Sequence, residues 1–323
     1  MHPAFSVIFL TTLLGVGQGL FLALFSSQAY SVVDVLPAQS GNFYALGAFI
    51  ALLFLIGGLI SSVFHLGHPE RAWRAAAMWR TSWLSREVIA LPITMAVIAV
   101  YALVNWLGID ADLYGLGFPN QLALSVGAFG VVATLALFVC TAMIYAAIKF
   151  LQEWASPLTV VNYFVLGTAS GFVFATAFAA IAAPELVQFY GGWAITLTIA
   201  GLLTRAASLF RNTRIKQISS VQTAIGVRHN KVRQGSMGMM GGSYNTREYF
   251  HGRNAAFLKS VKWIFLVLVF PIPLLLLWIG LAQSNTNLLM LAFAVQYVGL
   301  LFERWFFFAQ ANHPQNLYYQ VVG

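Results

Sequence analysis

Eight apolar runs divide this chain of 323 residues and restrict the kind of fold that it can adopt. A helix needs roughly 20 apolar residues to cross the hydrocarbon core of a bilayer, and each run reaches that length. Inside a bilayer every backbone polar group must be hydrogen-bonded within the protein, and a helix achieves this within one segment. We therefore predict an all-α integral membrane protein, a bundle of eight transmembrane helices forming a single domain over residues 1–323. The runs lie near residues 5–27, 42–66, 86–107, 121–148, 158–183, 186–210, 261–282 and 286–309.

The composition supports this class and argues against a nucleic-acid-binding protein. Hydrophobic residues make up 60% of the sequence and charged residues 8%, as expected where lipid is the main solvent. A formal net charge of +8 is also found in proteins that bind nucleic acid, but here Lys and Arg stand in the loops between apolar runs. We expect membrane lipid as a partner and no nucleic acid.

The charges of the loops predict the topology, because Lys and Arg accumulate in cytoplasmic loops. The loops after the second and sixth runs hold most of the Lys and Arg, and the loop after the fourth has Lys149, whereas the loops between them carry acidic residues and no Lys or Arg. This pattern places both termini in the cytoplasm. It also makes residues 211–260, which are basic and rich in glycine, a cytoplasmic insertion between spans six and seven. The insertion is either a flexible linker or, as its length and aromatic residues favour, a docking surface for a cytoplasmic partner.

Two local signals predict how particular helices begin or bend. Pro271 and Pro273 fall inside the seventh run, where each removes a backbone donor, so we expect a kinked helix that continues through them. Ser85 stands just before the third run and is a suitable residue to cap that helix.

The stretch from residue 65 to residue 87 concentrates titratable side chains, with two histidines and four arginines between two apolar runs. His65 stands at the cytoplasmic end of the second span. An imidazole with an ordinary pKa of about 6.5 exchanges a proton near neutral pH and hydrogen-bonds a carbonyl oxygen, which are the abilities that a quinone site needs. The alternative is that His65 only anchors the helix at the membrane interface.

Glu87 strengthens the first interpretation, because it stands at the start of the third span and therefore at the same end of an antiparallel helix pair as His65. Glu87 also has a simpler interpretation, since an acidic residue in the first turn is favoured by the helix dipole. Trp83 lies close by and belongs either to an aromatic belt at the lipid headgroups or to the wall of a flat apolar slot. We take His65 and Glu87 as the candidate catalytic pair.

Three arginines are further candidates for the same site. A guanidinium group close to a quinone would stabilise negative charge on its ring, and Arg71, Arg80 and Arg304 lie at cytoplasmic ends of predicted helices. The alternative is that all three are ordinary positive anchors. Glu303, next to Arg304, is open to interpretation as a simple charge partner.

The chain lacks the residues for metal cofactors of its own. Cys140 is the single cysteine, which excludes an iron–sulfur cluster ligated by this chain alone. Histidines near the bilayer are confined to His65 and His68, at one end of one helix, so we expect no haem and no metal site.

Three motifs resemble the dimethyl sulfoxide reductase anchor subunit family: HLGHPERAWRA at 65–75, RTSWLSRE at 80–87 and ERWFFFAQANHPQNLYYQ at 303–320. The long loop, with TAIGVRH at 223–229 and MGGSYNTREYFHG at 240–252, resembles the branch of this family that serves cytoplasmic quinone-dependent sulfite dehydrogenases. The resemblance implies a complex of three subunits in the bacterial inner membrane. A molybdopterin subunit would act on a sulfur compound, and an iron–sulfur subunit would dock on the cytoplasmic face of this chain. The family's quinol-binding histidine and glutamate match His65 and Glu87.

The resemblance predicts a membrane anchor that reduces ubiquinone or menaquinone with electrons from sulfite oxidation. One alternative is an anchor that oxidises quinol for a dimethyl sulfoxide or related reductase, since the direction of electron flow depends on the partner subunits. Another is a transporter for a small anion, which would need polar groups near the middle of the membrane. Spans three to eight contain almost no ionisable residues between their ends, which argues against transport. A third alternative is a passive anchor that has no site.

Overall fold

The computed structural model describes residues 1–64, 66–111, 119–216, 218–229, 231, 249–314 and 316. All the secondary structure in these residues is helical, and eight helical segments are long and apolar enough to cross a membrane. The prediction of eight spans is confirmed. The spans are α1 (Phe5–Val32), α2 (Gly41–Val63), α3 (Trp83–Leu107), α4 (Gln121–Ala146), α5 (Pro157–Ala182), α6 (Val187–Thr213), α9 (Ala255–Val269) continued by α10 (Pro271–Ala282), and α11 (Thr286–Ala309). Three short helices lie outside them: η1 (Pro69–Met78), η2 (Pro184–Leu186) and α7 (Val221–Ile225).

Several helices extend beyond the predicted apolar runs. Helix α3 begins at Trp83, and its cap is Ser82 rather than Ser85, because the Ser82 hydroxyl accepts the backbone N–H of Ser85 at 3.3 Å. The seventh span begins at Ala255, six residues before the apolar run, where the Asn254 side chain caps the helix by accepting the N–H of Phe257 at 2.8 Å. Hydropathy missed these turns because they carry polar residues at the membrane surface.

The seventh span is interrupted at a single residue, Phe270, between α9 and α10. We predicted one kinked helix that continues through the prolines. In the structure one helix ends and another begins within the same span. Pro271 cannot donate to the helix, and a residue that precedes proline is disfavoured in helical conformation. The carbonyl of Val269 would ordinarily accept the N–H of residue 273, which is a proline. The side chain of Gln296 on α11 donates to that carbonyl instead, at 3.4 Å.

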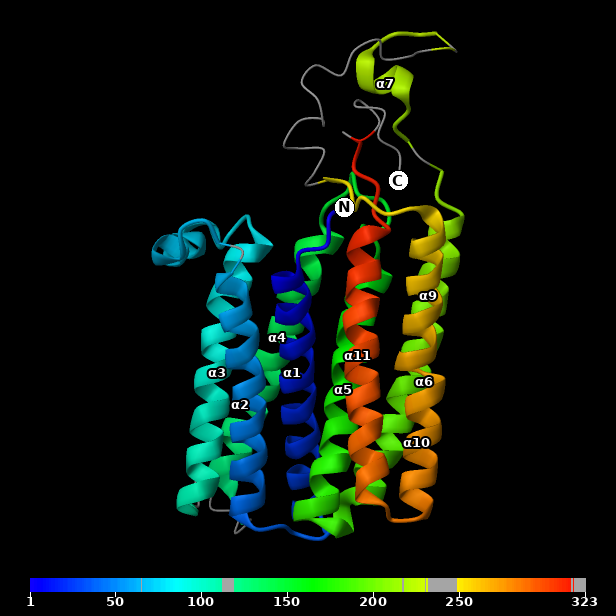
Figure 1. Ribbon diagram of the computed structural model, residues 1–323. Helices are drawn as coiled ribbons and strands as arrows, with labels where there is room; N and C mark the ends of the chain where they lie inside the picture. The colour runs from blue at the N-terminus through cyan, green and yellow to red at the C-terminus, as the bar shows by residue number, and fades with distance from the viewer. Residues whose placement is uncertain are drawn as a thin grey trace.

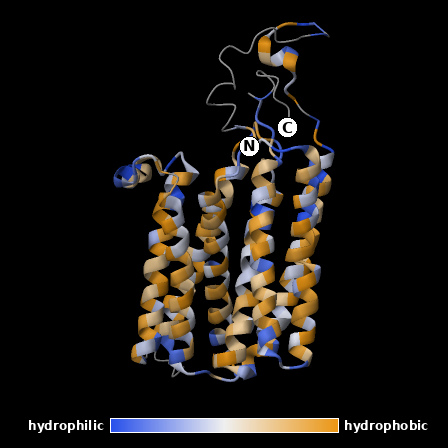
Figure 2. Ribbon diagram, in the orientation of Figure 1, coloured by the Kyte–Doolittle hydropathy of each residue, from blue (hydrophilic) through white to orange (hydrophobic). Residues whose placement is uncertain are grey.

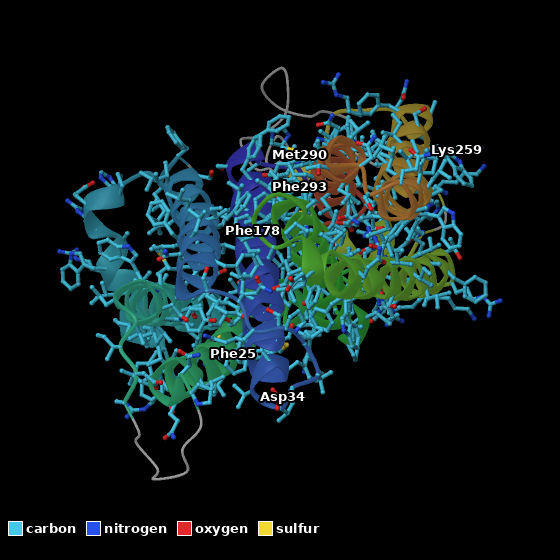
Figure 3. The ribbon with its side chains drawn as sticks, turned by 90° about the horizontal axis from the view of Figure 1, so that it is seen from below. Phe25, Asp34, Phe178, Lys259, Met290 and Phe293 are labelled. Atoms are coloured by element: carbon cyan, nitrogen blue, oxygen red, sulfur yellow. The ribbon has the colours of Figure 1, made fainter. Side chains whose placement is uncertain are left out.

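Helices α1 and α5 form the centre of the bundle, as the view along its axis shows (Figure 3). They pack through glycine, with Gly15 and Gly19 of α1 against Gly167 and Gly171 of α5. A Cβ atom added at Gly171 would lie 2.1 Å from the carbonyl carbon of Gly19, so the two backbones are in direct contact. Small residues four apart commonly allow such close packing of helices in membranes, where van der Waals contact drives association.

One end of the bundle carries most of the features that concern function. The amino terminus, η1, α7 and the last turn of α11 all lie at this end (Figure 1). The sides of the bundle are predominantly apolar and polar residues gather at both ends (Figure 2). Asp34 lies at the opposite end, where α1 finishes (Figure 3). We call the end with η1 and α7 the basic end, because its loops hold Arg71, Arg80 and Lys149.

Candidate functional site

Glu87 is buried inside the basic end of the bundle, in the second turn of α3, with 7% of its surface exposed. The hydroxyl of Thr141 on α4 donates a hydrogen bond to Glu87 Oε1 at 2.5 Å. The first turn of α3 contains no acidic residue, so the interpretation of Glu87 as a first-turn acid favoured by the helix dipole is wrong. Its carboxyl group is instead held between two helices in a polar interior.

A second charged group is buried between α6 and α11. Arg205 Nε lies 2.8 Å from Glu303 Oε1, and both side chains are 1% exposed. Arg304 Nε lies 3.4 Å from the other carboxylate oxygen of Glu303, so one carboxylate lies between two guanidinium groups. We call Arg205, Glu303 and Arg304 the charged triad. It is an exception to the expectation that spans three to eight contain almost no ionisable residues between their ends, because Arg205 stands eight residues, or about 12 Å, before the end of α6.

Two tyrosines lie between the charged triad and Glu87. The guanidinium carbon of Arg304 lies 3.7 Å from the centre of the Tyr163 ring, and Tyr163 stacks on Tyr145 with ring centres 5.7 Å apart. Both phenols interact electrostatically with Glu87 and with Arg304. Arg304 and Glu87, which the sequence assigned to one site, therefore belong to one polar region although no direct bond joins them.

A cavity of about 20 Å³ completes this region, and its lining includes Thr141, Tyr163 and Arg304. A space of this size holds about one water molecule and needs several polar partners to keep it there. Thr12 and Gln18 of α1 also line the cavity. The space therefore has room for one water molecule beside the threonine that bonds Glu87.

The remaining predicted contact residues lie at the surface. Arg71 is exposed on η1, and its Nε lies 3.6 Å from Glu70 Oε1. Arg80 is exposed and lies over the ring of Trp79, with 4.9 Å from its guanidinium carbon to the ring centre. Trp83 is half-buried at the first position of α3, and the guanidinium carbon of Arg86 lies 4.1 Å from the centre of its ring. The structure thus separates Arg71 and Arg80 from the buried pair of Glu87 and Arg304.

Arg86 links the surface helix to the span that carries Glu87. Its side chain donates to the backbone carbonyls of Trp79, at 2.9 Å, and of Arg80, at 2.8 Å. These bonds close the turn between η1 and α3. The predicted residues Arg80 and Trp83 therefore both contact Arg86 at the start of α3.

His65 lies outside the described residues, so its prediction stays a prediction. The chain is described up to Phe64, which caps α2 with 81% of its surface exposed, and again from Leu66. The glycine- and methionine-rich part of the long loop is also outside the described residues. Within them, no group of three or more His, Cys, Asp or Glu side chains is placed to bind a metal ion.

Comparison with known proteins gives a family to this arrangement. The family model described as DMSO reductase anchor subunit matches residues 1–319. The chain belongs to the DMSO reductase anchor subunit family. It is also 59% identical, over the whole length of both chains, to a protein of Allochromatium vinosum that is named as a subunit of sulfite dehydrogenase. The predicted family is therefore confirmed.

In this anchor-family chain, sequence reasoning missed Thr141, Tyr163 and Arg205. An arginine inside an apolar run is itself a sign of function or of a buried partner, and Arg205 carried that signal. Thr141 and Tyr163 gave none, because hydroxyl groups are common in transmembrane helices and their importance depends on which helix faces them.

Proposed function

We propose that this chain is the membrane anchor and quinone-reactive subunit of a molybdopterin and iron–sulfur oxidoreductase, and that it passes electrons from sulfite oxidation to the quinone pool. The observation that carries the proposal is the full-length identity of 59% to a subunit of a sulfite dehydrogenase. The family match supports the role of anchor. The buried carboxyl group of Glu87 supports a site for proton exchange in this chain.

The cofactor in this proposal is ubiquinone or menaquinone, which when bound would supply a two-electron, two-proton acceptor. The chemistry of the residues fits such a group: Glu87 offers a buried carboxyl that holds and moves a proton at its Oε atoms, and Thr141 orients that carboxyl. His65 would bind the ring from the neighbouring end of α2. Trp83 would provide an apolar edge toward the lipid, where a quinone enters.

The arginines take different roles in the proposal. Arg304 contributes positive charge from within the bundle, stacked on Tyr163, and so favours negative charge nearby without needing direct contact. Arg71 and Arg80 are exposed and would act at the rim of the site. We keep both as candidate contacts, because η1 is joined to α3 through Arg86.

The partners would dock on the basic end, which we place in the cytoplasm with both termini, as the positive-inside rule requires. An iron–sulfur subunit would contact this end and a molybdopterin subunit would bind to it in turn. We retain residues 211–260 as a cytoplasmic insertion that serves docking. Residues 1–323 would then form one domain of a multi-pass protein of the bacterial inner membrane, and protons for the quinone would come from the cytoplasm.

Two other functions make different predictions. An anchor for a sulfur-compound reductase would oxidise quinol at the same residues, and the potential of the partner subunits would decide the direction. A small-anion transporter would need an accessible charged path. The charged triad disfavours transport, because its side chains are almost fully buried and paired with one another.

The test measures sulfite-dependent quinone reduction by the purified three-subunit complex, with an artificial dye acceptor as the control for the soluble subunits. His65→Ala and Glu87→Gln should each lower quinone reduction by about 100-fold, a usual contribution of a positioned acid or base, while dye reduction persists. If both variants reduce quinone at the wild-type rate, the site lies elsewhere. If the wild-type complex oxidises quinol with dimethyl sulfoxide and ignores sulfite, the reductase alternative is correct.

A further inference from the structure

A groove of about 390 Å³ opens beside the amino-terminal end of α1, between α1, α9 and α11. Helix α11 packs against both of the others. The volume lies within the range of roughly 300–1,000 Å³ that is typical of sites for small ligands. None of the proposed quinone-site residues that the structure describes lines it, and we treat it as a separate feature of the molecule.

The lining of the groove has a polar part and an apolar part. His2, His251 and Arg253 lie at the loop side, where the chain enters α1 and α9. Phe9 and Val261 belong to the apolar part, which follows the helices toward the middle of the membrane. The described lining contains no carboxylate. A positively charged head region above an apolar channel is the pattern that suits an amphiphile with an anionic headgroup.

His251 is arranged as a hydrogen-bond donor in the polar part. Its Nδ1 accepts the backbone N–H of Arg253 at 3.1 Å, so a neutral imidazole carries its proton on Nε2. Burial lowers the pKa of His251, and the nearby chain amino group and His2 lower it further. The permanent positive charge of the groove is the exposed guanidinium of Arg253, whose carbon lies 5.4 Å from the centre of the Phe257 ring.

The apolar part of the groove is open toward the lipid. Phe5 is 68% exposed and Phe257 is 44% exposed. Both residues lie in the first turn of their helices. Trp305 closes the other side and packs against both Phe257 and His251, with ring centres 5.6 and 6.3 Å apart. Aromatic side chains at this depth pack well against the upper part of an acyl chain.

We propose that this groove binds one anionic phospholipid, with its phosphate at Arg253, His251 and His2 and one acyl chain along α9 and α11. An uncharged quinone ring would gain little from Arg253. A zwitterionic lipid would bring a cation into a region that already holds one. The charge of the lining therefore favours an anionic lipid over both.

The experiment uses native mass spectrometry of the complete complex after delipidation, titrated with phosphatidylglycerol, phosphatidylcholine or decylubiquinone. Arg253→Gln removes the charge at the surface and should lower retention of phosphatidylglycerol about fivefold, since one Lys or Arg near a membrane contributes about 1 kcal/mol. Val261→Trp fills the apolar part and should abolish retention at this site. Lys259→Gln is the matched control, because Lys259 lies on α9, six residues after Arg253, but points outward (Figure 3) and does not line the groove.

The outcomes distinguish the proposal from its alternatives. Selective retention of phosphatidylglycerol that is lost in Arg253→Gln and kept in Lys259→Gln supports it. Equal retention of phosphatidylcholine, or equal loss in both charge variants, overturns it. It is also overturned if Val261→Trp loses bound decylubiquinone and keeps phosphatidylglycerol, because the groove would then be a quinone site. If Val261→Trp fails to assemble, Arg253→Gln alone decides, since its side chain is exposed and outside the core.

Discussion

The guanidinium of Arg205 and the carboxylate of Glu303 meet at 2.8 Å, and each side chain is 1% exposed. This ion pair joins α6 to α11, and Arg304 extends it toward Tyr163. Charges are costly inside a bilayer unless they are paired, so the pair constrains how these helices pack. With two guanidinium groups and one carboxylate, the charged triad carries a net positive charge, and Tyr163 and Tyr145 connect it to the region of Glu87.

Removing Glu303 alone should destabilise the protein more than removing Glu303 and Arg205 together. Glu303→Gln leaves two buried guanidinium groups without their carboxylate, at a cost of about 3–5 kcal/mol for a buried pair. The double variant Glu303→Gln with Arg205→Gln removes one of the stranded charges and should recover part of the loss. Thermal unfolding of the detergent-solubilised protein measures both. A single variant as stable as the wild type would show that the pair contributes nothing.

Removing the hydroxyl partner of Glu87 should impair quinone reduction without impairing assembly. Thr141→Val keeps the shape of the side chain and loses the 2.5 Å bond, so we expect kcat for quinone to fall about tenfold, as for a lost hydrogen bond to a charged group. Thr141→Ser retains a hydroxyl group and should restore most of the rate. If Thr141→Val reduces quinone at the wild-type rate, the hydroxyl does not matter; if Thr141→Ser is as impaired as Thr141→Val, a hydroxyl group at this position is not sufficient.

Glycine at the contact of α1 and α5 should be irreplaceable. Gly171→Leu would force apart two backbones that already touch, and we expect loss of the folded protein from the membrane. Gly192 on α6 has open space around the position of a Cβ, so Gly192→Leu is the matched control and should accumulate normally. Immunoblots of membrane fractions distinguish the two, and equal amounts would show that α1 and α5 can separate.

Acid should destabilise the protein partly through His251. Its pKa in the folded state is lowered by burial, so the unfolded chain binds a proton more readily near the ordinary pKa of about 6.5. The free energy of unfolding should therefore fall as the pH is lowered through that value. Melting curves from pH 7.5 to pH 5 in detergent without added phospholipid test this, and His251→Gln should show a weaker dependence. An identical dependence in the variant would assign the effect to other groups.

The sequence predicted the number of spans and the family, because both depend on patterns that are local in the chain. The length of each apolar run predicts one membrane-spanning helix. The motif that contains Glu87 is contiguous in the sequence, so it identifies the family directly. The interruption at Phe270 was harder to predict, because whether two prolines bend or break a helix depends on partners such as Gln296, which lies on another helix.

The interior of the candidate site was least predictable. Glu87 was identified from its position, but its burial depends on how α4 packs on α3, and Thr141 carries no signal of its own. Arg205 and Glu303 lie far apart in the sequence, so their pairing follows only from the arrangement of α6, α9 and α11. Arg71 and Arg80 were grouped with Glu87 by proximity in the chain, and the structure places both side chains at the surface.

The ion pair between α6 and α11 also has a consequence for how the protein is made. Arg205 enters the membrane about 100 residues before its counter-charge is synthesised, and an unpaired guanidinium in lipid is unfavourable. Helix α6 can therefore reach its final state only after α11, the last span, has been inserted. A chain that stops before α11 would therefore keep the Arg205 guanidinium without its carboxylate partner.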